Sequence, residues 1–125
     1  MKVKGVLIDV YSSNVMVVEM QATLENYYNA LQCDIIDIVN REINGKRFDI
    51  VCDDEGLFKE NPKISAIDKN NDPMLVGNLF ICNVDVTGKE CSLSDSDIEL
   101  IMASVKTMAT RKYPNPYPML VGVDW

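Results

Sequence analysis

The first apolar segments of the chain have the patterns of β-strands. Residues 3–10 and 14–20 are rich in Val, Ile, Leu and Met, and the polar residues 11–14 between them favour a turn. β-branched residues return over 33–43, and Asn44-Gly45 is then a strong hairpin signal because both residues tolerate positive φ. The pattern therefore predicts two hairpins. On the return strand of the second, alternation places one set of apolar residues together, and we expect this set to face the core: Phe48, Ile50 and Cys52.

Two later segments have the apolar spacing of helices. Thr23 can cap the first, which is expected to end near Gln32 and whose apolar positions are Leu24, Tyr27, Tyr28 and Leu31. Ser94 is a good N-cap for the second, with Asp97 at its N3 position. The apolar stripe of this second helix is Ile98, Ile101, Met102, Val105 and Met108.

The middle of the chain is rich in loop signals. Residues 57–73 contain Asn61-Pro62 and a polar run, and they predict a long loop with at most one short helical turn. Residues 74–86 then have the composition of a strand, with Gly77 at a bulge or close approach. The fold class that follows is α+β: a small, mainly antiparallel sheet from two hairpins and a further strand, packed against two helices.

The C-terminal segment begins with a run of prolines. Residues 113–118, Tyr-Pro-Asn-Pro-Tyr-Pro, cannot continue the preceding helix, because proline lacks a backbone donor and clashes with the previous turn. Residues 119–125 are apolar enough to dock, either as an edge strand of the chain's own sheet or on a partner by strand addition. We therefore predict one α+β domain over residues 1–112 and a Pro-rich extended tail over 113–125.

The composition is that of a folded, acidic protein. The chain has 125 residues, of which 47% are hydrophobic, and this length suffices for a core without disulfide or metal support. Its net charge of -7 repels the phosphate backbone, so direct nucleic-acid binding is not expected. The same charge suits docking onto a basic, nucleic-acid-binding protein. The residues expected to contact such a partner are Asp53, Asp54 and Glu55 at the hairpin tip, Asp95 and Asp97 at the last helix's start, and the aromatics Tyr113, Tyr117 and Trp125.

Neither a membrane span nor a secretion signal is expected. No apolar run approaches the roughly 18 residues needed to cross a bilayer, and the basic start meets Asp9 before a signal-peptide apolar region is complete. We therefore expect a cytoplasmic protein. The four cysteines are scattered without CxxC spacing, which is typical of buried, reduced thiols: Cys33, Cys52, Cys82 and Cys91.

The common catalytic and cofactor signatures are missing. The chain has no histidine, the usual general base near neutral pH and a common metal ligand. Residues 68–72 imitate the opening of a calcium-binding EF-hand loop, but Pro73 and Leu79 stand where the glycine and the bidentate glutamate are required. No glycine-rich phosphate loop is present. We expect no enzyme activity, no metal and no cofactor.

Binding of a nucleotide-like ligand without turnover is an alternative. It requires an aromatic stacking surface and a few cations, which four residues near the last helix could provide, especially across a homo-oligomer interface: Arg111, Lys112, Tyr113 and Tyr117. Their other interpretation is as helix-end charges that complement the dipole.

Three short motifs are similar to those of a known family. The segments Ile50 to Leu57 (IVCDDEGL), Gly77 to Cys82 (GNLFIC) and Ser92 to Ile98 (SLSDSDI) resemble the strand-turn, strand and helix start of the proteins grouped as domain of unknown function 3846. The chain departs from that pattern at Asn61-Pro62-Lys63-Ile64, where members often carry Asn-Arg after a proline. The tail from Tyr113 is a second departure.

The resemblance implies a gene carried by bacteriophages, plasmids or conjugative elements, without an established activity. Small proteins of that origin often counter host defence. We therefore expect a non-enzymatic accessory protein, in the cytoplasm of an infected or element-bearing bacterium, that inhibits a defence system such as CRISPR-Cas or a similar nuclease effector by binding a protein component. The alternatives are a sponge for a cyclic or ADP-ribose-type nucleotide signal, and a structural or regulatory protein of the mobile element.

Overall fold

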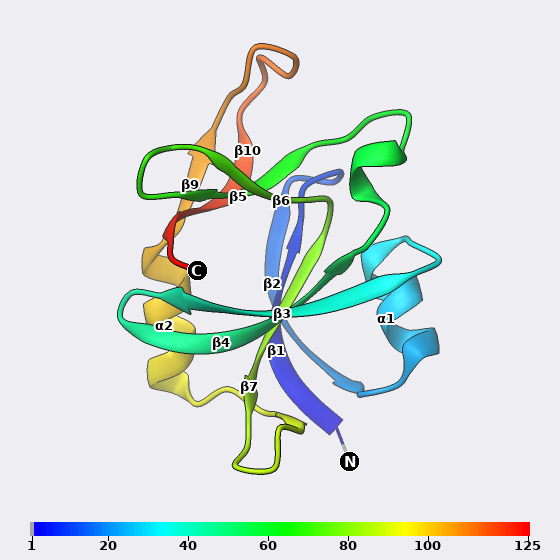
Figure 1. Cartoon of the computed structure of the whole chain (residues 1–125), viewed down its shortest axis with the longest axis vertical. Coiled ribbons are helices and arrows are strands. Elements are labelled where there is room, and N and C mark those ends of the chain that lie inside the picture. The colour runs from blue at the N-terminus through cyan, green and yellow to red at the C-terminus, as the bar shows by residue number, and fades with distance from the viewer. Residues whose placement is uncertain (1) are drawn as a thin grey trace.

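The computed structural model describes residues 2–125 and contains two sheets and two α-helices (Figure 1). The α+β class with mainly antiparallel strands is confirmed. In chain order the elements are β1 (Lys2–Asp9), β2 (Asn14–Gln21), α1 (Leu24–Leu31), β3 (Ile36–Ile43), β4 (Lys46–Asp53), the 3-10 turn η1 (Gly56–Phe58), β5 (Ile64–Asp68), β6 (Pro73–Val76), β7 (Leu79–Val84), β8 (Glu90–Cys91), α2 (Asp95–Ala103), β9 (Val105–Met108) and β10 (Tyr117–Val123).

The first sheet contains both predicted hairpins. Its strand order is β2-β1-β7-β4-β3, β8 pairs with β7, and all these pairs are antiparallel. Asn44 and Gly45 both have positive φ, 50° and 85°, at the β3–β4 turn, as the sequence predicted. The sheet is therefore built from the N-terminal three quarters of the chain.

The second sheet was not foreseen. Its order is β6-β5-β10-β9, with β5 and β10 parallel. The prediction of a loop throughout residues 57–73 is wrong, because residues 64–68 form β5. The single strand predicted over 74–86 is also wrong. It is divided between the two sheets at Gly77, whose φ is 86°, and at the buried Asn78, whose side chain accepts a hydrogen bond from the Val10 amide at 2.9 Å.

The second helix is shorter than its apolar stripe. α2 ends at Ala103, and the predicted helical positions Val105 and Met108 lie in β9. There they pair with Leu120 and Tyr117 of β10. Val105 and Met108 continue the helical spacing of the stripe, but they pair with a neighbouring strand. Tertiary pairing therefore determines their conformation.

Two hydrophobic clusters pack on opposite faces of the first sheet. On one face, Tyr27 and Leu31 of α1 pack against Phe80 and Val51. On the other face, the second sheet and α2 cover a larger cluster that includes Phe48, Ile50 and Cys52, as predicted. Because α1 covers the remaining face, β4 is buried on both sides. The two helices accordingly lie on opposite sides of the molecule (Figure 1).

The C-terminal segment is a central strand of the second sheet. β10 lies between β5 and β9, so the expected edge position is wrong. Its residues Tyr117, Met119, Leu120 and Val123 are buried in the main cluster. Pro114 and Pro116 lie in the loop that connects β9 to β10, which projects at the top of Figure 1, whereas Pro118 belongs to β10. The predicted boundary between domain and tail, after residue 112, falls between β9 and β10, which pair with each other in one sheet.

The segment that imitates an EF-hand is the β5–β6 turn, in which Asp68 Oδ1 accepts hydrogen bonds from the amides of Asn70 and Asp72 at 2.8 and 2.9 Å. No helix within residues 2–125 is long and apolar enough to cross a membrane.

Candidate functional site

The end of β4 is fixed by a buried carboxylate. Asp53 Oδ1 accepts a hydrogen bond from the Glu55 amide at 2.9 Å, and Oδ2 lies 2.8 Å from Lys59 Nζ. Lys59 also donates to the backbone carbonyl of Gln32 at the end of α1. Burial alone would lower the pKa of Lys59, but its hydrogen bond with Asp53 and the charge of that carboxylate raise the pKa above the usual value. The turn between these two residues is therefore held at both ends.

The 3-10 turn η1 presents two large apolar side chains to solvent. Gly56 is buried against β6, where a Cβ atom would come within 2.9 Å of the Val76 carbonyl oxygen. The two residues that follow, Leu57 and Phe58, are 72% and 85% exposed.

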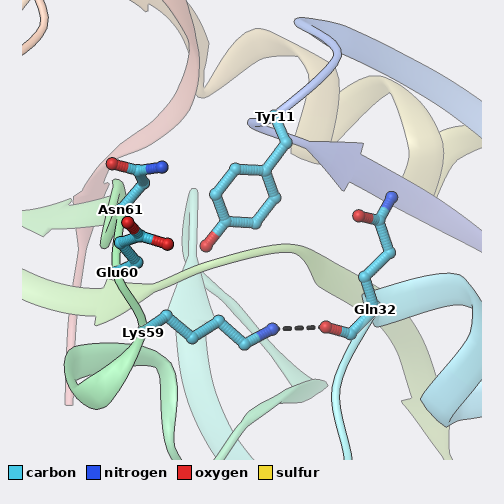
Figure 2. A pocket seen from close by; sticks show the side chains of 5 residues that line it. All are labelled: Tyr11, Gln32, Lys59, Glu60 and Asn61. Carbon is cyan, nitrogen blue, oxygen red and sulfur yellow. Dashed lines mark hydrogen bonds between the residues drawn. The ribbon is translucent and has the colours of Figure 1, made fainter.

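A hollow of about 310 Å³ lies beside this turn. Figure 2 shows the residues that line it: Tyr11, Gln32, Lys59, Glu60 and Asn61. Tyr11 comes from the β1–β2 turn, where Asp9 Oδ1 accepts a hydrogen bond from its amide at 3.0 Å. Its ring projects into the hollow with the hydroxyl directed toward Lys59 (Figure 2). Burial raises the pKa of Tyr11 above its usual value, against the opposing charge of Lys59.

The first group of predicted acidic contacts lies at this turn. Asp54 and Glu55 are exposed, and neither forms an ion pair with any residue of the described chain. Asp53 is buried beneath them. The expected position at a hairpin tip is wrong, because the β3–β4 hairpin turns at Asn44-Gly45, at the opposite end of β4.

The second group of acids, at the start of α2, is placed differently. Asp97 is buried and completes a capping box with Ser94, whose amide donates to its Oδ2 at 2.9 Å. It also accepts hydrogen bonds from Lys46 and from Asn83. Burial would raise the pKa of Asp97, but these hydrogen bonds outweigh burial and hold the pKa well below its usual range. Asp95 is exposed, and its carboxylate lies 3.7 Å from the Lys4 ammonium.

The two acidic groups do not form one surface. Lys46, the ion-pair partner of Asp97, begins β4, and Asp53 ends it. Seven residue steps of about 3.3 Å separate these ends by about 23 Å. The η1 turn and the start of α2 are therefore separated by about the length of β4, and a partner that contacts one need not contact the other.

The predicted aromatic contacts are also divided. Tyr117 is buried, and its hydroxyl donates to the Ile64 carbonyl at 2.8 Å. Tyr113 packs edge-on against it, with ring centroids 6.5 Å apart. Trp125 is 68% exposed and lies near β3, with the Arg41 guanidinium 4.4 Å from its ring centre.

The alternative ligand-binding residues lie together except for Tyr117. Arg111, Lys112 and Tyr113 line a hollow of about 280 Å³ together with Pro62, Ile64 and Thr110. Tyr117 lies behind Tyr113. Lys63 adds a cation that the sequence analysis did not select: its ammonium lies 5.0 Å from the Tyr113 ring centre and 5.1 Å from that of Tyr117.

The residues that build the η1 turn and its hollow were mostly missed. Tyr11 was assigned to a turn, and Leu57, Phe58 and Lys59 to a loop. One signal was available: two adjacent large apolar residues after a glycine are unusual in a polar loop and call for either burial or a binding role.

All four cysteines are free, but the predicted burial is correct for only two of them. Cys52 and Cys82 are buried, whereas Cys33 and Cys91 are half-buried. Within residues 2–125, no group of three or more acidic or cysteine side chains is arranged to hold a metal ion.

Comparison with known proteins gives one match. No curated protein and no solved structure matches the chain. A family model, described as Domain of unknown function (DUF3846), matches residues 1–106. The match includes the whole first sheet, η1 and α2, and it ends within β9, so the central strand β10 lies outside it. Since the matched residues make up most of the sequence, the chain belongs to the DUF3846 family.

Proposed function

We propose that this chain is a non-enzymatic accessory protein of a phage or mobile element that binds and inhibits a bacterial defence protein through the η1 turn. One observation carries the proposal: Leu57 and Phe58 are adjacent, 72% and 85% exposed, and mounted on a fixed turn. The partner class, a nuclease effector of a system such as CRISPR-Cas, comes from the type of genetic element that the resemblance implies. Its place of action would be the bacterial cytoplasm.

The shape of the turn favours a protein partner. A few buried aromatic and aliphatic side chains supply most of the binding energy at protein interfaces, and they do so best when they are already ordered. The Asp53–Lys59 pair and the packing of Gly56 on β6 hold the backbone of the turn in place before any partner arrives. The cost of ordering the turn's backbone on binding is accordingly small.

The charge around the turn favours a basic partner. The exposed carboxylates of Asp54, Glu55 and Glu60 flank Leu57 and Phe58, while the nearby cation of Lys59 is paired with Asp53. An apolar centre with an acidic rim complements an apolar pocket in a basic surface, which is typical of nucleic-acid-binding effectors. Electrostatic attraction would mainly accelerate association.

The test measures binding and nuclease inhibition with a panel of purified bacterial defence nucleases. For the effector that binds the wild-type chain, the double variant Leu57→Ser, Phe58→Ser should raise the dissociation constant at least about 30-fold. This corresponds to roughly 2 kcal/mol of binding free energy. Val86→Ser is the matched control, because Val86 is fully exposed in the distant β7–β8 turn. Equal binding by the double variant and the control would refute the role of η1.

A second pair of variants tests the acidic rim. Asp54→Lys with Glu55→Lys should slow association and weaken its salt dependence, because both carboxylates lie beside η1. Asp95→Lys should leave binding unchanged, because Asp95 lies near the far end of β4. If Asp95→Lys is the more harmful change, the contact surface is at α2 instead.

The second candidate is a sponge for a nucleotide signal. The observation that favours it is the pair of ammonium groups near the Tyr113 ring centre, Lys63 at 5.0 Å and Lys112 at 5.7 Å, beside a hollow of about 280 Å³ that Arg111 also lines. A cyclic or ADP-ribose-type nucleotide at 100 times its dissociation constant should stabilise the fold by about 2.7 kcal/mol. Thermal unfolding with a set of such nucleotides distinguishes this candidate, since Arg111→Ala should abolish the shift and Leu57→Ser should not.

A further inference from the structure

The outer edge of the first sheet is a long, unprotected strand. β2 pairs only with β1, in an unbroken register from Lys2↔Gln21 to Asp9↔Asn14. Along residues 14–20, no backbone hydrogen bond leads to any other described part of the chain. Such an edge offers a row of backbone donors and acceptors to another strand.

The sequence of β2 lacks the features that usually protect an edge. Within Asn14–Gln21 there is no Lys, Pro or Gly, and Glu19 is the sole charged residue. Five of its eight residues are Val or Met. Met16 and Val17 are 40% and 47% exposed, and as neighbours in a strand they point to opposite faces of the sheet. An added strand would therefore cover apolar surface on both faces.

The other edges are shorter, or partly occupied and charged: β3 equals β2 in length but carries Asp37, Arg41 and Glu42. At the opposite edge of the same sheet, Glu42 of β3 exchanges two backbone hydrogen bonds of 2.9 Å with Asp124. In the second sheet the edge strands β6 and β9 have four residues each, and β6 begins at Pro73 with irregular pairing to β5. Among the described edges, β2 is thus the one suited to strand addition.

From these observations we infer that β2 pairs antiparallel with β2 of a second copy of this chain, which joins the two first sheets into one. The two copies are related by a two-fold axis perpendicular to the sheet, so each face of one sheet continues the same face of the other. In an antiparallel pair such an axis passes between two copies of one residue, which lie directly opposite each other. With the axis at Val17, residues 14–20 of one copy pair completely with 14–20 of the other.

The charges in this register are compatible with self-pairing. Val17 then lies opposite Val17 of the second copy, Met16 opposite Val18, and Val15 opposite Glu19. Glu19 never faces its own copy, so no like charges oppose each other in the ladder. The net charge of -7 on each copy opposes association at longer range, and salt screens this repulsion. Dimerisation should consequently strengthen as ionic strength rises.

The test measures the mass of the full chain by sedimentation equilibrium from 1 to about 500 μM at low and at physiological salt. We expect twice the monomer mass of 14.1 kDa at high concentration. Val17→Lys should weaken the dimer by at least about tenfold while the melting temperature of the monomer is kept, because two ammonium groups then face each other across the axis. Val86→Lys, which adds the same charge at a fully exposed position in the β7–β8 turn, should remain dimeric.

A cross-link fixes the geometry independently. In Val17→Cys the two new thiols lie on directly opposite residues, whose Cα atoms in an antiparallel pair are about 4.5 to 5.5 Å apart and so allow a disulfide. Mild oxidation should produce a covalent dimer that Val86→Cys does not form. A monomer at all concentrations, or a dimer that Val17→Lys leaves intact, would overturn the inference. Either result leaves the proposed role of η1 untouched, since that surface lies on a different element.

Discussion

Lys59 Nζ lies 2.8 Å from Asp53 Oδ2 and joins the residue after η1 to the buried end of β4. The Asp53 side chain is 2% exposed, and the ammonium is its nearest counter-charge in the ion pair. Because Lys59 also donates to the Gln32 carbonyl, the same group connects the turn to the end of α1. Together with the packing of Gly56 on β6, this cation fixes the turn that carries Leu57 and Phe58.

Replacement of Lys59 by Met should destabilise the protein measurably. It leaves the Asp53 carboxylate buried without a counter-charge, and we expect a loss of about 2 kcal/mol in the free energy of unfolding. This is below the value for a fully buried pair, since Lys59 is partly exposed. Urea unfolding followed by circular dichroism measures it. Adding Asp53→Asn should recover part of the loss, and an unchanged midpoint for Lys59→Met alone would contradict the importance of the pair.

Asp97 should make stability fall in acid. Its pKa is lowered in the folded state, so its contribution is fully present above the unfolded-state pKa of about 3.9 and is lost as the pH falls below that value toward the folded-state pKa. We expect Asp97→Asn to cost about 2 kcal/mol at pH 7. The difference between wild type and variant should shrink at pH 3. Urea unfolding at both pH values checks this, and a constant difference would show that Asp97 does not control the acid response.

Removal of residues 113–125 should abolish the cooperative fold. The shortened chain loses the buried side chains of Tyr117, Met119, Leu120 and Val123. At roughly 1.5 to 3 kcal/mol for each of the four side chains, the loss of about 6 to 12 kcal/mol is comparable to the whole free energy of unfolding of a typical domain, about 5 to 15 kcal/mol. Differential scanning calorimetry should show no sharp transition, whereas deletion of Trp125 alone should leave one. A sharp transition in the shortened chain would support an independent domain over residues 1–112.

The cysteines should react with thiol reagents in two groups. Burial raises the pKa of Cys52 and of Cys82 to about 12, so these thiols should be silent toward Ellman's reagent at pH 8 in the native protein. Cys33 and Cys91 are half-buried and should react slowly. All four should react in denaturant. Rapid reaction of all four in the native state would mean that the sheet opens at Cys52 and Cys82.

Local signals were sufficient for the two hairpins of the first sheet, but not for the bounds of β7 or for the second sheet. The Asn44-Gly45 turn, the Thr23 cap and the alternation around Phe48 each fix structure within a few residues, and each prediction is confirmed. β5, β9 and β10 are instead fixed by pairing between segments far apart in the chain. Leu120, for example, pairs with Ala66 on one side and Val105 on the other. No local pattern records such a pairing.

The site was predictable only in part, for a related reason. The sequence identified Asp53, Asp54 and Glu55 as a group, but it could not show that the first is buried and paired with Lys59. The distance between this group and Asp97 depends on the direction of β4 after its turn. Tyr11, in the β1–β2 turn, lines the hollow beside η1 together with Lys59, which is far from it in the sequence. Their convergence is a property of the assembled sheet.

Hydrogen exchange on the complex with a nuclease effector that binds the chain tests the central claim most directly. If the η1 turn is the contact surface, the amides of residues 54–61 should exchange more slowly in the complex than in the free protein. Those of residues 95–97 and 111–113 should not change. Protection confined to the start of α2 or to the β9–β10 loop, with residues 54–61 unaffected, would contradict the account.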